Sequence, residues 1–117
     1  MDQIQVTATL PSIAPENLAA FKALAAEVLT VVAEEAGTLQ HDWFLNDDET
    51  VCVVHETYAD SDVVLAHLGH LGELLGRLIP LGGGFSIDLF GTPSAELTAA
   101  MEALHPTVYR YFQGKQR

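Results

Sequence analysis

The segment from Gly37 to Tyr58, GTLQHDWFLNDDETVCVVHETY, has the pattern of a β-hairpin. Leu39 to Leu45 alternates between apolar and polar side chains, and Thr50 to Tyr58 is rich in Val and Thr, as half-buried strands are. The polar residues between them, Asn46 to Glu49, have the length and composition of a hairpin turn. The sequence therefore predicts two antiparallel neighbouring strands in one sheet.

Helical patterns flank this hairpin on both sides. The first helix is predicted over Pro15–Gly37, with the proline at its first position and the glycine as its C-cap. Its apolar stripe consists of Leu18, Phe21, Leu24 or Ala25, Val28 and Val32. The second helix is predicted to begin with Asp60 or Ser61 as N-cap and to end near Ile79, because Pro80 follows.

The outer segments complete a ferredoxin-like order of elements. Ile4 to Leu10 and Phe85 to Phe90 alternate as strands, and Ser94 is placed to cap a short third helix. The order βαββαβ predicts an α+β domain with a four-stranded antiparallel sheet and both main helices on one face. We expect a single domain over 1–117, in which 94–117 form an extra C-terminal helix and an aromatic tail.

Composition limits the function classes. The 117 residues include 16 acidic and 5 basic side chains, a formal net charge of −11, which argues against binding nucleic acid or an anionic membrane surface. Cys52 is the only cysteine, so an internal disulfide is excluded. We see neither the pattern of a signal peptide nor an apolar segment long enough to span a membrane, and we therefore expect a cytoplasmic protein.

His67 is the histidine whose position most favours a role in a site. On a helical projection it lies about 60° from Val64, at the edge of the apolar arc that also contains Leu71. It should therefore point toward the sheet, either as a buried imidazole satisfied by a backbone carbonyl or as a site residue. His70 falls on the solvent side. Because the two histidines diverge and no carboxylate pair completes a ligand set, no metal is expected.

The hairpin carries the other candidate residues. Alternation puts His41 and Trp43 on the face opposite Phe44 in its first strand, and Glu56 and Tyr58 on the face opposite His55 in its second. Which set shares the face of Trp43 depends on a one-residue choice of pairing register, which the sequence leaves open. In either register, a large aromatic side chain and at least one titratable group share a face.

Three segments resemble a known family: Gly37 to Leu45, the strand end Glu56-Thr57-Tyr58-Ala59-Asp60, and the helical segment Val64-Leu65-Ala66-His67-Leu68. They are similar to the antibiotic biosynthesis monooxygenase family, whose members share a dimeric α/β barrel. The family includes cofactor-independent oxygenases of aromatic polyketides, quinol monooxygenases and haem-degrading enzymes. The Asn-Trp-His set of the haem-degrading members is not recognisable in this chain.

The resemblance implies a small aromatic, polyketide-type or quinol-type substrate that lies between sheet and helices, loses a proton and is oxygenated without flavin, metal or other cofactor. In this interpretation His67 matches the helix histidine of the family, and the further catalytic candidates are Trp43, His41 and His55. The candidates for substrate binding are Tyr58, Glu56, Phe44 and Leu71. The alternative is a non-catalytic dimeric barrel that binds a small hydrophobic ligand.

A homodimer is the first testable expectation. With both main helices on one face, the other face of the sheet still carries apolar side chains, and pairing two such faces would cover them. Sedimentation at micromolar concentration should give twice the chain mass of 12.6 kDa. A monomer under these conditions would contradict both the dimer and the barrel.

Overall fold

The alternating segments form one sheet in the computed structural model, which describes residues 2–115. Its strands are β1 (Ile4–Leu10), β2 (Thr38–Leu45), β3 (Cys52–Tyr58), β4 (Ser86–Phe90) and β5 (Thr107–Tyr109). They lie in the order β2-β3-β1-β4-β5. The first four pair antiparallel, so the predicted ferredoxin-like βαββαβ arrangement is confirmed.

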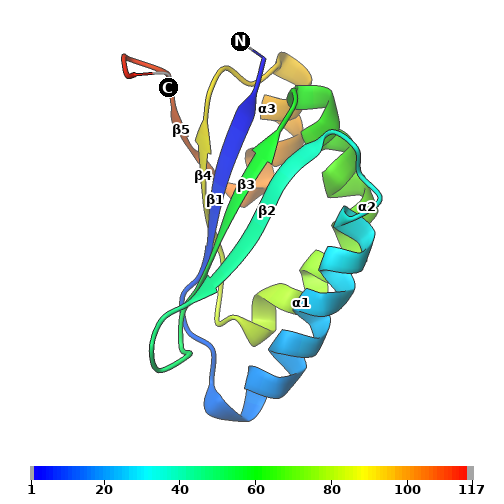
Figure 1. Cartoon of the computed structure of the whole chain (residues 1–117), viewed down its shortest axis with the longest axis vertical. Helices are drawn as coiled ribbons and strands as arrows, with labels where there is room; N and C mark the ends of the chain where they lie inside the picture. The colour runs from blue at the N-terminus through cyan, green and yellow to red at the C-terminus, as the bar shows by residue number, and fades with distance from the viewer. Residues whose placement is uncertain (1, 116–117) are drawn as a thin grey trace.

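The helices cover one face of this sheet (Figure 1). They are α1 (Leu18–Val32), preceded by the 3-10 turn η1 (Pro15–Asn17), then α2 (Ser61–Leu81), and α3 (Ala95–Met101), followed by the 3-10 turn η2 (Glu102–Leu104). The side chain of Asp60 caps α2 by accepting a hydrogen bond from the backbone N–H of Val63, and Ser94 caps α3 in the same way. The polar side chains predicted at both helix starts therefore satisfy free backbone donors.

The segment expected as an aromatic tail contains a fifth strand. β5 pairs in parallel with β4, with Val108 opposite Leu89, so the sheet is five-stranded and mixed rather than four-stranded and antiparallel. The reason lies in the connection, because α3 carries the chain between β4 and β5, and a helical crossover joins parallel strands. Three residues are too few to show an alternating pattern in a sequence.

Two helix ends differ from the sequence prediction. α2 continues through Pro80 to Leu81. α1 ends at Val32, five residues before the expected C-cap at Gly37. Gly37 has a different role, because a Cβ atom there would lie 2.4 Å from Cγ2 of Val63. The glycine therefore lets the start of α2 approach the turn that leads into β2.

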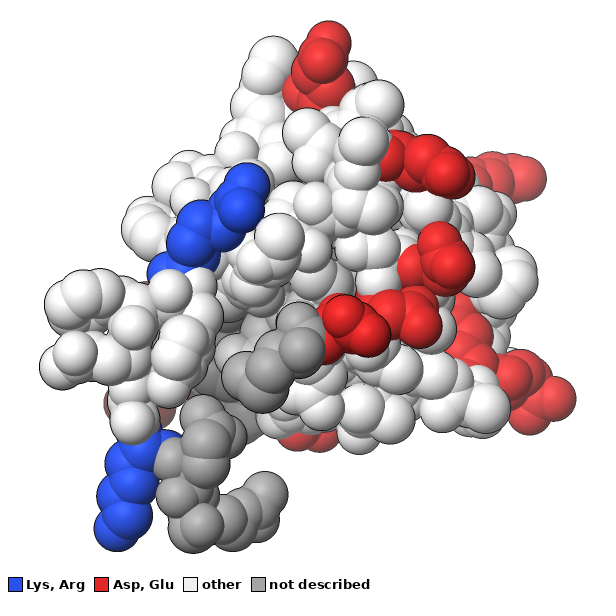
Figure 2. Space-filling model, turned by 90° about the horizontal axis from the view of Figure 1, so that it is seen from above, with Lys and Arg blue, Asp and Glu red and all other residues white. Residues whose placement is uncertain are grey.

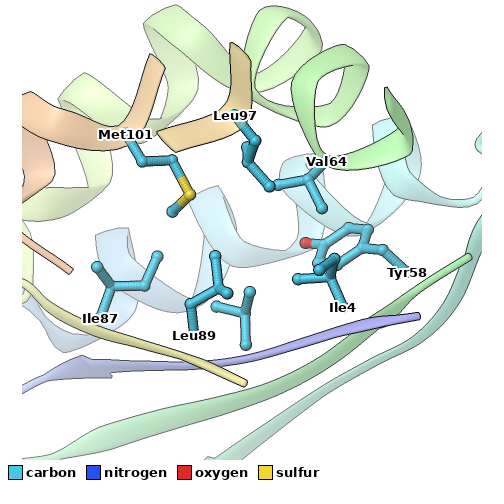
Figure 3. Close-up of a cluster of buried hydrophobic side chains, with 8 residues drawn as sticks. Ile4, Tyr58, Val64, Ile87, Leu89, Leu97 and Met101 are labelled. Atoms are coloured by element: carbon cyan, nitrogen blue, oxygen red, sulfur yellow. The ribbon is translucent and has the colours of Figure 1, made fainter. Parts of the chain in front are cut away.

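The core fills the layer between the sheet and the helices. The predicted apolar face of β1 is buried, and the stripe predicted on α1 is buried at Phe21, Leu24, Val28 and Val32. Figure 3 shows Leu97 and Met101 of α3 above Ile87 and Leu89 of β4, with the ring of Tyr58 beside Val64 of α2. Burial of these side chains is the main source of stability for such a layer.

The opposite face of the sheet is not covered by helices (Figure 1). It carries large side chains that are about half exposed, among them Phe44 at 51% and Tyr109 at 50%. Phe90 stacks on Tyr109 with ring centroids 5.3 Å apart. An apolar surface of this kind is unusual on a protein that has no partner.

Acidic side chains predominate on the face seen in Figure 2, and the few basic ones lie to one side. This distribution agrees with the net charge of −11 and leaves no broad basic surface in this view for a phosphate backbone. Within residues 2–115, no helix is both long enough and apolar enough to cross a membrane.

The outer face of α2 provides a test of its stability. Gly69, Gly72 and Gly76 are exposed, and a Cβ atom at each would meet no other atom within 4 Å. Replacing each by Ala should raise the free energy of unfolding by about 0.5–1 kcal/mol, because Ala loses less backbone entropy in a helix. Denaturant unfolding measures the change. Gly37→Ala is the matched control and should destabilise the protein, and equal effects at all four positions would contradict this assignment.

Candidate functional site

An apolar cavity lies between the sheet and the helices. Its lining comes from β1, β2, β3, β4, α1, α2, α3 and η2, and its polar members are His41, Trp43, Glu56, Tyr58 and His67. The free volume is about 50 Å³, which is room for a few water molecules. A ring-sized ligand would therefore require lining side chains to move. Unbranched Met101 and the half-buried Leu68 and Leu104 are suited to such a rearrangement.

The register of β2 on β3 brings the polar members together. His41 lies opposite Glu56 and Trp43 lies opposite Val54, so both side chains of β2 share the helix-facing side with Glu56 and Tyr58. A β-bulge at Leu39 precedes this segment, because Thr38 pairs with Tyr58 and Gln40 with the adjacent Thr57. The choice of register that the sequence left open is thereby decided.

Six of the eight predicted site residues line the cavity. They are His41, Trp43, Glu56, Tyr58, His67 and Leu71. The other two, His55 and Phe44, contact each other on the opposite face of the sheet, with ring centroids 5.1 Å apart. The structure does not bring them to the cavity, because side chains of adjacent strand residues point to opposite faces.

His67 is held by a carboxylate rather than by a backbone carbonyl. Its Nδ1 lies 2.8 Å from Oε1 of Glu35, and Nδ1 of His70 lies 2.7 Å from Oε2 of the same side chain. Thr38 Oγ1 also donates to Oε1, at 2.8 Å. Although the two histidines diverge on α2 as predicted, one carboxylate in the turn after α1 joins them.

These contacts determine the charges of both groups. Burial alone would raise the pKa of Glu35, but the hydrogen bonds from His70, His67 and Thr38 outweigh it and lower that pKa. Burial lowers the pKa of His67, and Glu35 offsets this only in part. At neutral pH we therefore infer an ionised Glu35 that accepts the Nδ1–H of a neutral His67. The lone pair of His67 is then on Nε2.

His41 is a hydrogen-bond donor rather than a base. The indole N–H of Trp43 donates to Nδ1 of His41 at 2.9 Å, so a neutral His41 carries its proton on Nε2. Burial, followed by the nearby His67, lowers the pKa of His41 to about 4. Trp43 itself packs edge-on against Phe21, with ring centroids 6.3 Å apart, which holds the donor in place.

Glu56 is a buried carboxyl group with a strongly shifted pKa. Its Oε1 accepts a hydrogen bond from the hydroxyl of Tyr58 and lies 3.8 Å from Nε2 of His41. Burial raises the pKa of Glu56 to about 7, because the Tyr58 bond compensates only in part. The pKa of Tyr58 is raised well above its usual range, first by burial and then by Glu56, so the phenol stays protonated.

The same cluster has the spacing of a metal site. One donor atom from each of His41, Glu56 and His67 lies within 4.8 Å of the others. The hydrogen bonds favour acid–base chemistry instead. Nδ1 of His41 is occupied by the Trp43 N–H, so its Nε2 carries a proton, and Glu56 is partly protonated near neutral pH. Of the two imidazoles, only that of His67 presents a free lone pair.

Glu35 is the site residue that the sequence analysis missed. It follows α1 in the turn before β2, and its side chain is only 6% exposed. Its position matches no motif, but it continues the apolar stripe of the first helix, seven residues after Val28 and three after Val32, whereas the exposed Glu34 does not. The helical period could therefore have indicated an inward carboxylate, and the packing of the turn against α2 identifies its partners.

Comparison with protein families gives one match. The model of the antibiotic biosynthesis monooxygenase family matches residues 4–71, more than half of the chain. The matched part extends from β1 into α2 and includes the hairpin, Glu35 and His67. No curated protein matches the chain in sequence.

Solved structures share the fold. MupZ from Pseudomonas fluorescens matches with a TM-score of 0.83 at 20% identity, over 100% of this chain and 96% of that one. A Caulobacter crescentus protein named for the same monooxygenase family matches with a TM-score of 0.68 at 26% identity, over 80% and 92%. SnoaB, a cofactor-independent oxygenase from Streptomyces nogalater, matches in a mutant form with a TM-score of 0.62 at 17% identity, over 81% and 97%.

The buried carboxyl group at Glu56 should make stability depend on pH. Its folded-state pKa of about 7 lies above the ordinary 4.5, so the stability from its protonated form is complete below 4.5 and is lost as the pH rises through 7. Glu56→Gln lacks this titration. From pH 5 to pH 8, the wild type should therefore lose about 2–3 kcal/mol of unfolding free energy relative to the variant.

Denaturant unfolding at the two pH values measures this difference. Glu34→Gln is the control for net charge, because Glu34 is exposed. Taking differences between proteins removes the titration of His41 and Glu35, which is common to the wild type and the variant. A constant difference between wild type and Glu56→Gln from pH 5 to pH 8 would show that Glu56 is ionised in the folded protein throughout.

Proposed function

Because the chain belongs to the antibiotic biosynthesis monooxygenase family, we propose that it is a cofactor-independent oxygenase of a small aromatic, polyketide-type or quinol-type substrate. The observation that carries the proposal is the pairing of His67 with Glu35 beside an apolar cavity. This pairing directs the basic nitrogen of a neutral imidazole away from the carboxylate. A base that is unprotonated near neutral pH suits the removal of a proton from a phenol.

The proposed reaction begins with proton transfer. The substrate O–H bond breaks, and its proton forms an N–H bond at Nε2 of His67, leaving an electron-rich anion in the cavity. The anion supplies electrons to molecular oxygen, one oxygen atom enters the substrate, and the other leaves as water with protons from the substrate. Glu35 stabilises the imidazolium in the interval, in the way that a carboxylate supports a catalytic histidine in other enzymes.

The cavity favours a neutral substrate. None of the Lys and Arg side chains in the described part of the chain lines it, and its carboxyl groups are those of Glu56 and, behind His67, Glu35. A carboxylate or phosphate ligand would lose its hydration there without gaining a cation. A phenol or quinol enters uncharged, and the N–H of His41 is a donor for the oxygen that becomes negative.

We further propose that the protein is a homodimer formed through the uncovered face of the sheet. Phe44, Phe90 and Tyr109 support this arrangement because they expose apolar surface on that face. His55 and a shallow polar hollow lined by Gln5, Gln40 and Thr57 lie on the same face. In a dimer these groups would belong to the interface rather than to the cavity.

Oxygen consumption with a panel of anthrones and quinols tests the function, in the presence of a chelator and without added flavin. His67→Gln keeps the polarity and approximate size of the side chain but removes the base, so turnover should fall by roughly 10²–10⁴-fold with little change in ligand affinity. His105→Gln is the control, because the side chain of His105 is exposed and does not line the cavity.

Two outcomes would contradict the proposal. Unchanged turnover in His67→Gln would show that His67 is not the catalytic base, and His41 and Glu56 would then be the candidates for that role. Absence of any oxygen consumption in the wild type across the panel would favour the alternative function, binding of a small hydrophobic ligand without catalysis.

A further inference from the structure

His67 is connected to the surface of the molecule. The side chains of His67 and Glu35 are each 6% exposed, whereas that of His70 is 53% exposed. The contacts between them, 2.8 Å and 2.7 Å, use opposite oxygens of the carboxylate. Three titratable groups therefore lead in an unbroken series of hydrogen bonds from the cavity to solvent.

The other polar groups of the cavity have no such connection within residues 2–115. Trp43 donates to His41, and Tyr58 donates to Glu56, so both bonds join groups that line the cavity. The rest of the lining is apolar. Through the described side chains, a proton in the cavity therefore has a single hydrogen-bonded route to solvent, and this route begins at His67.

We propose that His67, Glu35 and His70 form a proton path between the cavity and solvent, in which Glu35 carries the proton between the two imidazoles and His70 is the solvent end. The use of this path in catalysis rests on the proposed function, in which His67 takes a proton from the substrate. The path itself is a property of the ligand-free protein.

Each step of the path conserves protons and involves no electrons. A proton taken up at Nε2 of His67 makes an imidazolium, whose Nδ1–H bond breaks as the proton moves to Oε1 of Glu35. At rest Nδ1 of His70 donates to Glu35, so His70 first changes to its Nε2–H tautomer by proton exchange with water. The neutral carboxyl group then turns about its Cγ–Cδ bond and donates its proton to Nδ1 of His70. His70, in its Nε2–H tautomer, then releases its Nε2 proton to water. The reverse steps return a proton and restore the first tautomer of His67.

The environment of Glu35 favours rapid return to the starting state. Hydrogen bonds from three donors hold the pKa of Glu35 below its usual range, so a proton on the carboxylate is passed on rather than kept. His70 is in contact with water and can change its tautomer there. Rings that contact His67 on the cavity side, those of His41 and Tyr58 at 5.3 Å and 5.1 Å, restrict its rotation.

Exchange of the Nδ1 proton of His67 with water, measured by NMR on ligand-free protein with ¹⁵N-labelled histidine, tests the path. The wild type should exchange this proton rapidly despite its burial. His70→Asn and Glu35→Gln should each slow the exchange by about tenfold or more, because a buried proton without a path exchanges only when the surrounding structure unfolds locally. The amide introduced by Glu35→Gln keeps an oxygen toward His67 but has no carboxyl group to carry the proton.

His105→Asn is the matched control and should exchange at the wild-type rate, because His105 is exposed and outside the path. Free imidazole should restore rapid exchange in His70→Asn by replacing the missing group, whereas a structural role of His70 would not be rescued. Equal rates in wild type, His70→Asn and Glu35→Gln would overturn the proposal, as would a His70→Asn rate that imidazole does not change.

This experiment separates the path from the proposed function. It uses no substrate and no oxygen. If the exchange experiment contradicts the path, the oxygenase proposal still stands or falls on the assay with His67→Gln. An intact path in a protein that consumes no oxygen would refute the function and not the path.

Discussion

The pairing of β2 with β3 is the constraint on which the site depends. Because the side chains of a strand alternate between faces, a slip of one residue would exchange His41 and Trp43 for Asp42 and Phe44 on the helix-facing side. Burying Asp42 among apolar side chains without a partner would cost several kcal/mol. The observed register includes the bulge at Leu39, and it places Trp43 on the helix-facing side, where its ring packs on Phe21.

A second consequence of this register is that several ionisable groups are buried in one apolar layer. Such burial is costly unless the polar atoms are satisfied, and within residues 2–115 every polar side-chain atom that is completely inaccessible to solvent has a hydrogen-bond partner. The two carboxylates are satisfied differently. Glu35 accepts three hydrogen bonds and is stabilised as an anion, whereas Glu56 accepts one and holds its proton up to about pH 7. Environments that give two carboxyl groups such different pKa values are typical of acid–base sites.

Family membership and fold say less about the chemistry of the cavity than the hydrogen bonds and burial of its polar side chains do. A ferredoxin-like sheet with helices on one face is compatible with many activities, and activity depends on the groups placed in the layer between them. In this chain those groups are one free imidazole lone pair, one imidazole N–H donor, a phenol and a carboxyl group, in a cavity without cationic side chains among the described residues. They suit proton transfer on a neutral ligand more than the binding of an anion.

The amino-acid sequence was sufficient to predict the elements with a long periodic pattern. Alternation in β1 and the hairpin, the stripe on α1 and the caps of α2 and α3 are local properties, because strand and helix periods depend on neighbouring residues only. The inward position of His67 follows from the same helical period. Six of the eight candidate side chains line the cavity, but alternation alone did not select the four on the hairpin, because it left the pairing register open.

Only the tertiary structure decided the rest. The register of β2 on β3 excluded His55 and Phe44 from the cavity, and pairing with β4 made a strand of Thr107–Tyr109. Glu35 became a partner of His67 across 32 positions of the chain because a turn packs against α2. Pairing, packing and ion contacts join residues that are distant in sequence, and a local pattern carries no information about which distant residue will complete it.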